Sequence, residues 1–213
     1  MMNCCDTKNY DAVFGEKRAR SDLKRYRKKG PAKTTRLLID ALKGAGVEDR
    51  TLLDIGGGIG AIANALLAAG ADSAVHVEAA DAFIGAAREE ATRRGNEARV
   101  RFVRGDFVAL AAEIPPADIV TLDRVICCYP DMEQLVTTSV THARRAYGIV
   151  IPRARRLSRM MGMGINLIFR IFRNPFRFHL HPPQDIERLI ARAGLSLHSA
   201  RETAIWRVAV FIR

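Results

Sequence analysis

Glycines and an acidic residue with the spacing of a nucleotide-binding turn occupy the segment LLDIGGGIG, from Leu52 to Gly60. Asp54 lies within an apolar, strand-like run, and the chain then turns into the apolar, helix-like run AIANALLAAG. Glycine suits such a turn because a Cβ would keep a ligand away from the backbone. The free N–H groups of the following helix favour negative charge near the turn. The turn contains Gly56, Gly57, Gly58 and Gly60.

Acidic residues also follow the next three predicted strands. Glu78 ends the run AVHVE, Asp106 follows RFVRG, and Asp123 follows DIVTL. In a doubly wound sheet the ligand lies at the carboxyl ends of the strands, near the point where the strand order reverses. Carboxylates there can bond an ammonium group, ribose hydroxyls and an adenine amino group, and Phe107 can pack on an adenine ring. We therefore expect these acids along one edge of the sheet, beside a hollow.

The elements that must position these residues alternate regularly, which predicts an α/β fold with a doubly wound, Rossmann-like, mostly parallel sheet. Strands are expected at 51–55, 74–78, 99–103, 117–122 and 146–151, and a closing pair at 195–201 and 204–212. Helices are expected at 59–69, 82–94, 132–145 and 184–193. Residues 1–46 are predicted to form a tail (1–11) and a helical cap (12–29 and 32–43). Residues 47–213 are predicted to form the main domain, with an inserted basic, Met-rich segment at 153–180.

Together these motifs resemble those of class I S-adenosylmethionine-dependent methyltransferases. LLDIGGGIG resembles the first motif of that family, VHVE the second, RGDF the third and ADIVTLDRVICCYPD the fourth. The resemblance implies a seven-stranded sheet with an antiparallel last strand, and S-adenosyl-L-methionine as the cofactor. The stretch DRVICCYPD and the basic N-terminal helix are loosely similar to the magnesium-protoporphyrin O-methyltransferase group. The cofactor-binding residues implied are Asp54, Gly56, Gly57, Gly58, Gly60, Glu78, Ala79, Asp106, Phe107, Asp123 and Arg124.

A nicotinamide enzyme is the alternative for the glycine turn, because Gly56-x-Gly58-x-x-Ala61 also fits a dinucleotide fingerprint. A chain of 213 residues is too short for a dinucleotide domain plus a full catalytic domain. A single-domain dehydrogenase would need a Tyr-x-x-x-Lys pair, and no tyrosine of this sequence has lysine four positions on. The methyltransferase interpretation is therefore favoured.

The chain is strongly basic, with 34 Lys and Arg against 23 Asp and Glu. Ten basic residues lie in 17–36 and seven arginines lie in 153–177, a segment without an acid. Such segments suit nucleic acid, an anionic membrane or an acidic substrate, or are plain solvated faces. Within the second, residues 160–169 carry no charge and fit a helix lying in a membrane interface or over an apolar pocket.

Cysteines occur as the adjacent pairs Cys4-Cys5 and Cys127-Cys128, without Cys-x-x-Cys spacing, so no metal site is predicted. Half-buried packing is expected for the second pair, and a soft metal or metalloid held by all four is a minor alternative. The N-terminus has no apolar run of signal-peptide type, so we expect a cytoplasmic protein, with peripheral membrane contact as a further expectation.

Methyl transfer is an in-line displacement in which an enzyme chiefly positions the nucleophile and excludes water. A carboxylate acceptor needs no base, whereas a phenol, amine or thiol can need one. Tyr129 and His181 are the candidates for a catalytic role, against packing of Tyr129 at the rim and a structural role for His181.

The sequence thus favours methylation, on oxygen, of a small or mid-sized acceptor that is amphiphilic and acidic. The acceptor is expected under the N-terminal helices and residues 160–169. The alternative is a non-catalytic basic module of the same fold that binds RNA or an anionic membrane. Few aromatics are interleaved with the basic residues, which disfavours nucleic acid. The sequence gives no oligomeric state.

Overall fold

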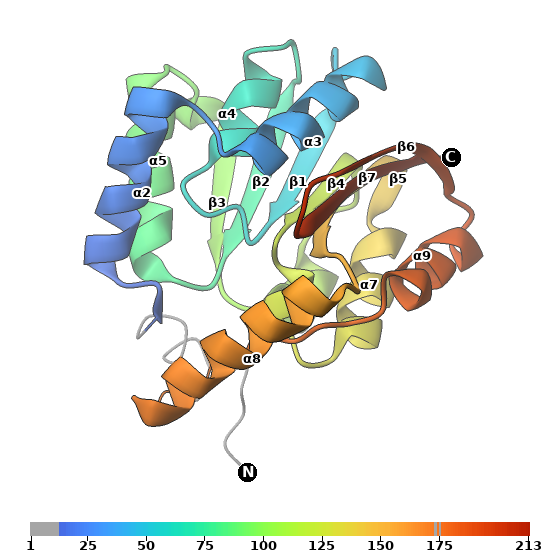
Figure 1. Cartoon of the computed structure of the whole chain (residues 1–213). Coiled ribbons are helices and arrows are strands. Elements are labelled where there is room, and N and C mark those ends of the chain that lie inside the picture. The colour runs from blue at the N-terminus through green and yellow to red at the C-terminus, as the bar shows by residue number, and fades with distance from the viewer. Residues whose placement is uncertain (1–12, 173, 175) are drawn as a thin grey trace.

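The computed structural model describes residues 13–172, 174 and 176–213, and it contains a seven-stranded sheet of order β3-β2-β1-β4-β5-β7-β6 (Figure 1). Strand β7 runs antiparallel to both of its neighbours, and the pairs among β1 to β5 are parallel. The predicted mostly parallel sheet with an antiparallel last strand is confirmed. The strands are β1 Thr51–Ile55, β2 Ser73–Glu78, β3 Val100–Arg104, β4 Ala117–Asp123, β5 Ala143–Pro152, β6 Ser196–Glu202 and β7 Trp206–Ile212.

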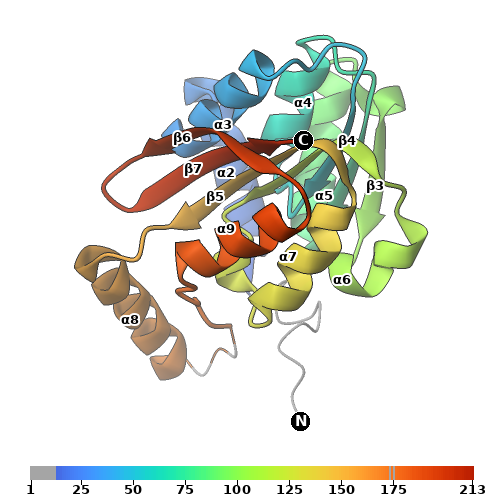
Figure 2. The ribbon, with the colours of Figure 1, turned by 90° about the vertical axis from the view of Figure 1, so that its right-hand side faces the viewer.

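Helices cover both faces of this sheet (Figure 2). Buried side chains of α3, α4 and α5 form one apolar core with one face, and those of α6, α7 and α9 form a second core with the other. The helices are α2 Glu16–Lys29, α3 Lys33–Gly44, α4 Ala61–Leu67, α5 Asp81–Arg93, α6 Phe107–Leu110, α7 Met132–Thr141, α8 Arg156–Ile171 and α9 Pro183–Arg192. The predicted tail at 1–11, with Cys4 and Cys5, lies outside the described residues.

The N-terminal helices have different positions. Helix α2 lies against α5, where Ala19, Leu23 and Tyr26 pack with Phe83 and Ala86. An ion-pair cluster reinforces this contact, because Glu90 of α5 accepts a 2.9 Å hydrogen bond from Arg27 Nε of α2. Helix α3 instead covers the sheet. It shares the apolar core that surrounds β1, so residues 33–44 are built into the main domain.

The predicted boundary between α7 and β5 was wrong. The helix expected at 132–145 ends at Thr141, and β5 begins at Ala143 instead of residue 146. The His142 ring explains this end, because its Nδ1 lies 2.8 Å from the Thr138 carbonyl oxygen and its Nε2 lies 3.1 Å from that of Ala111. Ala143 then pairs with Ala117 in the sheet. The sheet pairing therefore overrides the local helical pattern of the sequence.

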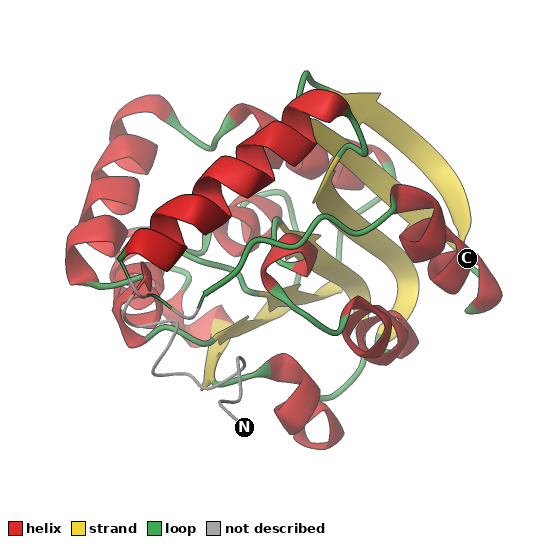
Figure 3. Cartoon of the chain, turned by 60° about the horizontal axis from the view of Figure 1, so that its bottom comes forward, coloured by secondary structure: helices red, strands yellow, loops and turns green. Residues whose placement is uncertain are grey.

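Helix α8 lies apart from the two helical layers. It begins soon after β5 ends and runs across the edge of the molecule toward which the carboxyl ends of the parallel strands point (Figure 3). The uncharged segment predicted at 160–169 is the middle of this helix, which is longer than that segment. No helix within the described ranges has the length and apolar character that a bilayer crossing requires.

Candidate active site

The glycine turn connects β1 to α4 and has the backbone conformation that its composition predicts. Gly56, Gly58 and Gly60 have φ angles of 61°, 57° and 74°, in the left-handed region that side chains rarely adopt. A Cβ on Gly56 would also lie 2.5 Å from Cγ2 of Val125. The backbone of the turn is therefore bare. Three hollows lie along this edge of the sheet: a first hollow lined by Asp54, a second lined by Asp106, and a larger cavity lined by Phe169. Gly56 borders all three.

Asp54 lies fully buried beneath this turn. Its Oδ1 accepts a 2.6 Å hydrogen bond from Thr121 Oγ1, whereas its Oδ2 has no hydrogen-bond partner among the described residues. Burial raises the pKa of Asp54 to about 7, the Thr121 hydroxyl opposes this rise, and the charges of Asp123 and Glu78 add to it. The carboxyl group thus has one oxygen without a hydrogen-bond partner beneath the turn, and Asp54 also lines the first hollow.

His76 lies beside Asp54, because the two residues are paired across β1 and β2. Its ring is fully buried, and neither ring nitrogen has a hydrogen-bond partner among the described residues. Burial lowers the pKa of His76 to about 4, so the ring is neutral at neutral pH. A Cβ on Gly57 would lie 2.5 Å from this ring and 2.7 Å from Asp54 Oδ2. The turn therefore rests directly on these two side chains.

Glu78 joins the end of β2 to the turn. Its Oε2 accepts a 3.0 Å hydrogen bond from the Gly58 amide, and its Oε1 accepts from the amides of Ala79 and Ala80 at 2.8 and 3.0 Å. These hydrogen bonds fix the carboxylate at the end of β2, against the glycine turn. Glu78 borders two of the three hollows and Ala79 borders one, and their contact with a ribose stays a prediction.

Asp106 and Phe107 border the hollow that lies past Glu78, on the side predicted for adenine. Asp106 is the N-cap of α6, where its Oδ1 accepts a 3.0 Å hydrogen bond from the Val108 amide. Its Oδ2 accepts a 3.0 Å hydrogen bond from the Tyr129 hydroxyl. Asp106 therefore serves as a helix cap and also forms part of a cavity wall.

Asp123 and Arg124 close the opposite end of the edge. Thr35 Oγ1 donates to Asp123 Oδ2 at 2.5 Å, and Arg124 Nε donates to Asp123 Oδ1 at 2.9 Å. Both residues border the first hollow and a larger cavity of about 470 Å³. The expectation that four strand-end acids gather along one edge beside a hollow is confirmed, and their roles toward the cofactor stay predictions.

Residues that the sequence interpretation missed complete the larger cavity. Arg18 and Asp22 reach it from α2, and Ile165 and Phe169 reach it from α8. The basic segment 17–36 and the apolar segment 160–169 pointed to these helices, but a pattern does not show which faces meet in space. Phe83 and Val125 also border the cavity, as do Cys127, Cys128, Phe176, Phe178 and Trp206.

The two candidate catalytic residues lie to one side of this cavity. Tyr129 is buried and borders the Asp106 hollow, not the larger cavity. His181 Nε2 lies 3.0 Å from the Tyr129 carbonyl oxygen, and its ring stacks on His179. These contacts give both residues a role in holding the loop after β4. Their catalytic role stays a prediction that the geometry does not favour.

The arrangement fits S-adenosylmethionine. The bare turn and the unpartnered Asp54 oxygen lie near Asp22 and three arginines at one end, Glu78 lies in the middle, and Asp106 with Phe107 lies at the other end. The first hollow is bordered by Arg18, Arg25 and Arg124. Arg25 does not border the larger cavity, so it can provide a cation for the carboxylate of the cofactor, whereas Arg18 and Arg124 border both. The protein therefore offers suitable partners for the amino-acid, ribose and base portions of the cofactor.

Comparisons with known proteins agree with this arrangement. No curated protein matches the chain. The fold is similar to that of magnesium protoporphyrin IX methyltransferase from Synechocystis PCC 6803, with a TM-score of 0.68 and 18% identity over 84% of this chain and 81% of that one. It is also similar to an O-methyltransferase family protein from Burkholderia thailandensis, with a TM-score of 0.72 and 16% identity over 95% of this chain and 62% of that one.

A third similar structure is human N-acetylserotonin methyltransferase in complex with S-adenosylmethionine, with a TM-score of 0.67 and 16% identity. Here 96% of this chain covers 58% of the human one, so the chain spans about three fifths of the two longer structures. A family model described as an O-methyltransferase domain matches residues 14–153. The chain therefore belongs to this O-methyltransferase family and is a class I S-adenosylmethionine-dependent methyltransferase.

Proposed function

We propose that this methyltransferase methylates an oxygen atom of a small or mid-sized amphiphilic acceptor that carries an acidic group. The observation that supports this most is the cavity of about 470 Å³ beside the glycine turn, which has an aromatic wall and two arginines. Its volume lies within the range of about 300–1,000 Å³ that is usual for small-molecule sites. Because Gly56, Gly58 and Glu78 also border it, the acceptor would lie next to the cofactor.

The aromatic wall comes from the C-terminal third of the chain. Phe169 of α8 packs edge-on against Phe176 with ring centroids 5.2 Å apart, and Phe178 and Trp206 border the same cavity. Asn166 fixes the Phe178 backbone from both sides, since it donates to the Phe178 carbonyl at 2.9 Å and accepts from its amide at 2.7 Å. This wall suits the apolar part of an acceptor.

The charged border comes from α2 and from the end of β4. The Arg18 guanidinium lies 5.2 Å from the centre of the Phe14 ring and 4.0 Å from Asp22, and Arg124 pairs with Asp123. Both arginines border the glycine turn as well as the larger cavity. Each can donate two parallel hydrogen bonds to a carboxylate, so together they can orient an acidic group near the cofactor.

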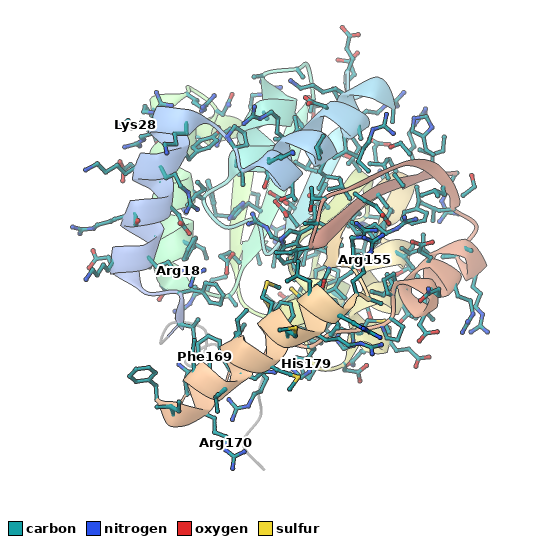
Figure 4. The ribbon with its side chains drawn as sticks, viewed as in Figure 1. Arg18, Lys28, Arg155, Phe169, Arg170 and His179 are labelled. Carbon is teal, nitrogen blue, oxygen red and sulfur yellow. The ribbon has the colours of Figure 1, made fainter. Side chains whose placement is uncertain are left out.

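Methyl transfer requires little from the protein beyond positioning the acceptor and excluding water from it. S-adenosylmethionine, when bound, supplies a methyl group on a positively charged sulfur. Arg18 and Arg124 would hold the acceptor, and the aromatic wall would exclude water from the reacting oxygen. A carboxylate oxygen needs no base, which agrees with the position of Tyr129 and His181 outside the large cavity. Arg18, which lies on α2 (Figure 4), borders this cavity, and this favours an enzyme over the alternative of a purely basic binding module.

Trp206 provides a direct test, because it is the only tryptophan of the chain and borders the cavity. Aromatic carboxylic acids and their neutral amides can be titrated while tryptophan fluorescence and transfer of a labelled methyl group are recorded. Two of the similar structures are named as methyltransferases of magnesium protoporphyrin IX and of N-acetylserotonin, so these two compounds are the next probes. We expect saturable fluorescence changes and methyl transfer with acids but not with amides.

Matched arginine variants sharpen this test. Arg18→Gln should weaken binding of the acid about tenfold and leave the amide unaffected, because it removes a charge-assisted hydrogen bond. Arg20→Gln is the control, since Arg20 is on the same helix, is highly exposed and pairs with Glu16. Equal binding of acid and amide, or equal losses in both variants, would reject an acidic acceptor.

A further inference from the structure

Helix α8 has an outer apolar surface that its packing against the protein leaves exposed. The large hydrophobic residues that the structure exposes are, apart from Leu197, all on this helix or directly after it, and their exposed fractions range from 52% to 78%. They recur at intervals of three and four residues, so they form one stripe along the helix. The outer stripe comprises Leu157, Met160, Met163, Leu167, Ile168, Ile171 and Phe172.

The opposite side of α8 packs against the protein and lines the larger cavity. Ser158 and Gly162 are buried, and a Cβ on Gly162 would lie 3.0 Å from the Phe178 ring. Ile165 and Phe169 border the acceptor cavity. The outer stripe is therefore a second apolar face, and an exposed contiguous apolar surface of this kind marks an interaction site.

Arginines accompany the outer stripe. Arg155, Arg156, Arg159 and Arg170 are exposed, and no acidic residue lies between Arg153 and Gln184. Arg155 and Arg170 lie at opposite ends of α8, and Arg170 points away from the side on which Phe169 lies (Figure 4). Positive charge thus lies at both ends of the apolar stripe, with three arginines at its start and one near its end.

We propose that α8 docks in the plane of an anionic phospholipid membrane. An interfacial helix buries an apolar face at the boundary between headgroups and acyl chains, while its basic residues attract anionic lipids. A second copy of this face would instead bring arginines against arginines, which disfavours self-association through α8. Bases of RNA would need stacking platforms, and Phe172 is the one aromatic residue in the outer stripe. This proposal does not depend on which acceptor the enzyme methylates.

Vesicle binding tests the proposal with the full chain. Sedimentation with vesicles of phosphatidylcholine alone, or of phosphatidylcholine with phosphatidylglycerol, should show at least about tenfold stronger binding to the anionic vesicles, because several exposed arginines are attracted to such a surface. This preference should decrease at high salt, since salt screens the attraction. No binding to anionic vesicles would overturn the proposal.

Variants separate the apolar stripe from general charge effects. Met163→Gln combined with Leu167→Gln should reduce binding to anionic vesicles at least about tenfold, whereas Leu197→Gln, which changes an exposed apolar residue on β6, should leave it unchanged. Arg156→Gln with Arg159→Gln should reduce binding as well, and Lys28→Gln on α2 is its control. Far-ultraviolet circular dichroism would verify that each variant is folded. Equal losses in test and control variants would contradict membrane docking. A dimer in solution that Met163→Gln with Leu167→Gln dissociates would contradict it as well.

Discussion

The Tyr129 hydroxyl donates a 3.0 Å hydrogen bond to Oδ2 of Asp106, and this contact joins the loop after β4 to the end of β3. Both residues border the hollow predicted to receive adenine. Tyr129, which the sequence suggested as a catalytic residue, is therefore hydrogen-bonded to Asp106, which is predicted to bind the cofactor. The contact gives Tyr129 a positioning role that can be separated by experiment from a catalytic one.

Tyr129→Phe removes the hydroxyl and keeps the ring. We expect affinity for S-adenosylhomocysteine to fall about two- to tenfold, the value of one hydrogen bond, while the single-turnover rate of the saturated enzyme changes less than about threefold. Calorimetry and rapid-quench kinetics would measure the two quantities. A general base would show a rate loss of about a hundredfold or more at unchanged affinity, and that result would restore the catalytic prediction.

Glu78→Ala should weaken cofactor binding by about 1–3 kcal/mol, because a ribose hydroxyl loses its acceptor and the Gly58 amide loses a restraint. Titration calorimetry with S-adenosylhomocysteine measures this loss. Glu78→Gln is the matched variant, since it keeps the side-chain shape and one acceptor oxygen, and its loss should be smaller. An affinity equal to that of the wild type in Glu78→Ala would reject the ribose assignment.

Gly57→Ala should lower the free energy of unfolding by about 1–3 kcal/mol, because the new Cβ would overlap the buried His76 ring and Asp54 Oδ2. Urea unfolding gives the value. Gly85→Ala is the control, as Gly85 is exposed within α5 and a Cβ there would meet no heavy atom within 4 Å, and it should raise stability by up to about 1 kcal/mol. Similar destabilisation in both variants would show that the packing beneath the turn is not the cause.

Glu90→Gln should reveal a pH-dependent contribution to stability. Burial raises the pKa of Glu90, but hydrogen bonds from Arg93, Arg94 and Arg27 outweigh it and lower the pKa from 4.5 to about 2. Because the folded-state pKa is the lower one, this stability is complete above pH about 4.5 and is lost as the pH falls toward about 2. At pH about 6 the free energy of unfolding of the wild type should exceed that of the variant by about 1–2 kcal/mol. The difference is no larger because the arginines are partly exposed and solvent screens their attraction to Glu90.

Denaturant unfolding of both proteins from pH 6 to pH 2.5 measures the Glu90 contribution. The difference between them should narrow steadily below pH 4.5. A difference that stays constant over this range would mean that the carboxylate charge of Glu90 does not hold α2 on α5.

The sequence by itself determined the local parts of this enzyme. Left-handed glycines and alternating apolar segments are properties of short stretches, so the turn after β1 and the order of strands could be predicted from them. The carboxyl ends of parallel strands must meet at one edge, which is why Asp54, Glu78, Asp106 and Asp123 could be placed together. The end of α7 could not be predicted in this way. It depends on the contact of the His142 ring with the carbonyl oxygen of Ala111, which lies 31 residues earlier in the chain.

Only the tertiary structure decided which helix faces meet. The basic pattern of α2 does not distinguish Arg18, which borders the cavity, from Arg20, which pairs with Glu16 at the surface. The apolar pattern of α8 likewise gives no reason why Phe169 faces the cavity while Ile171 faces solvent. These differences arise from contacts between segments that are far apart in the sequence, and such contacts depend on the packing of the whole chain.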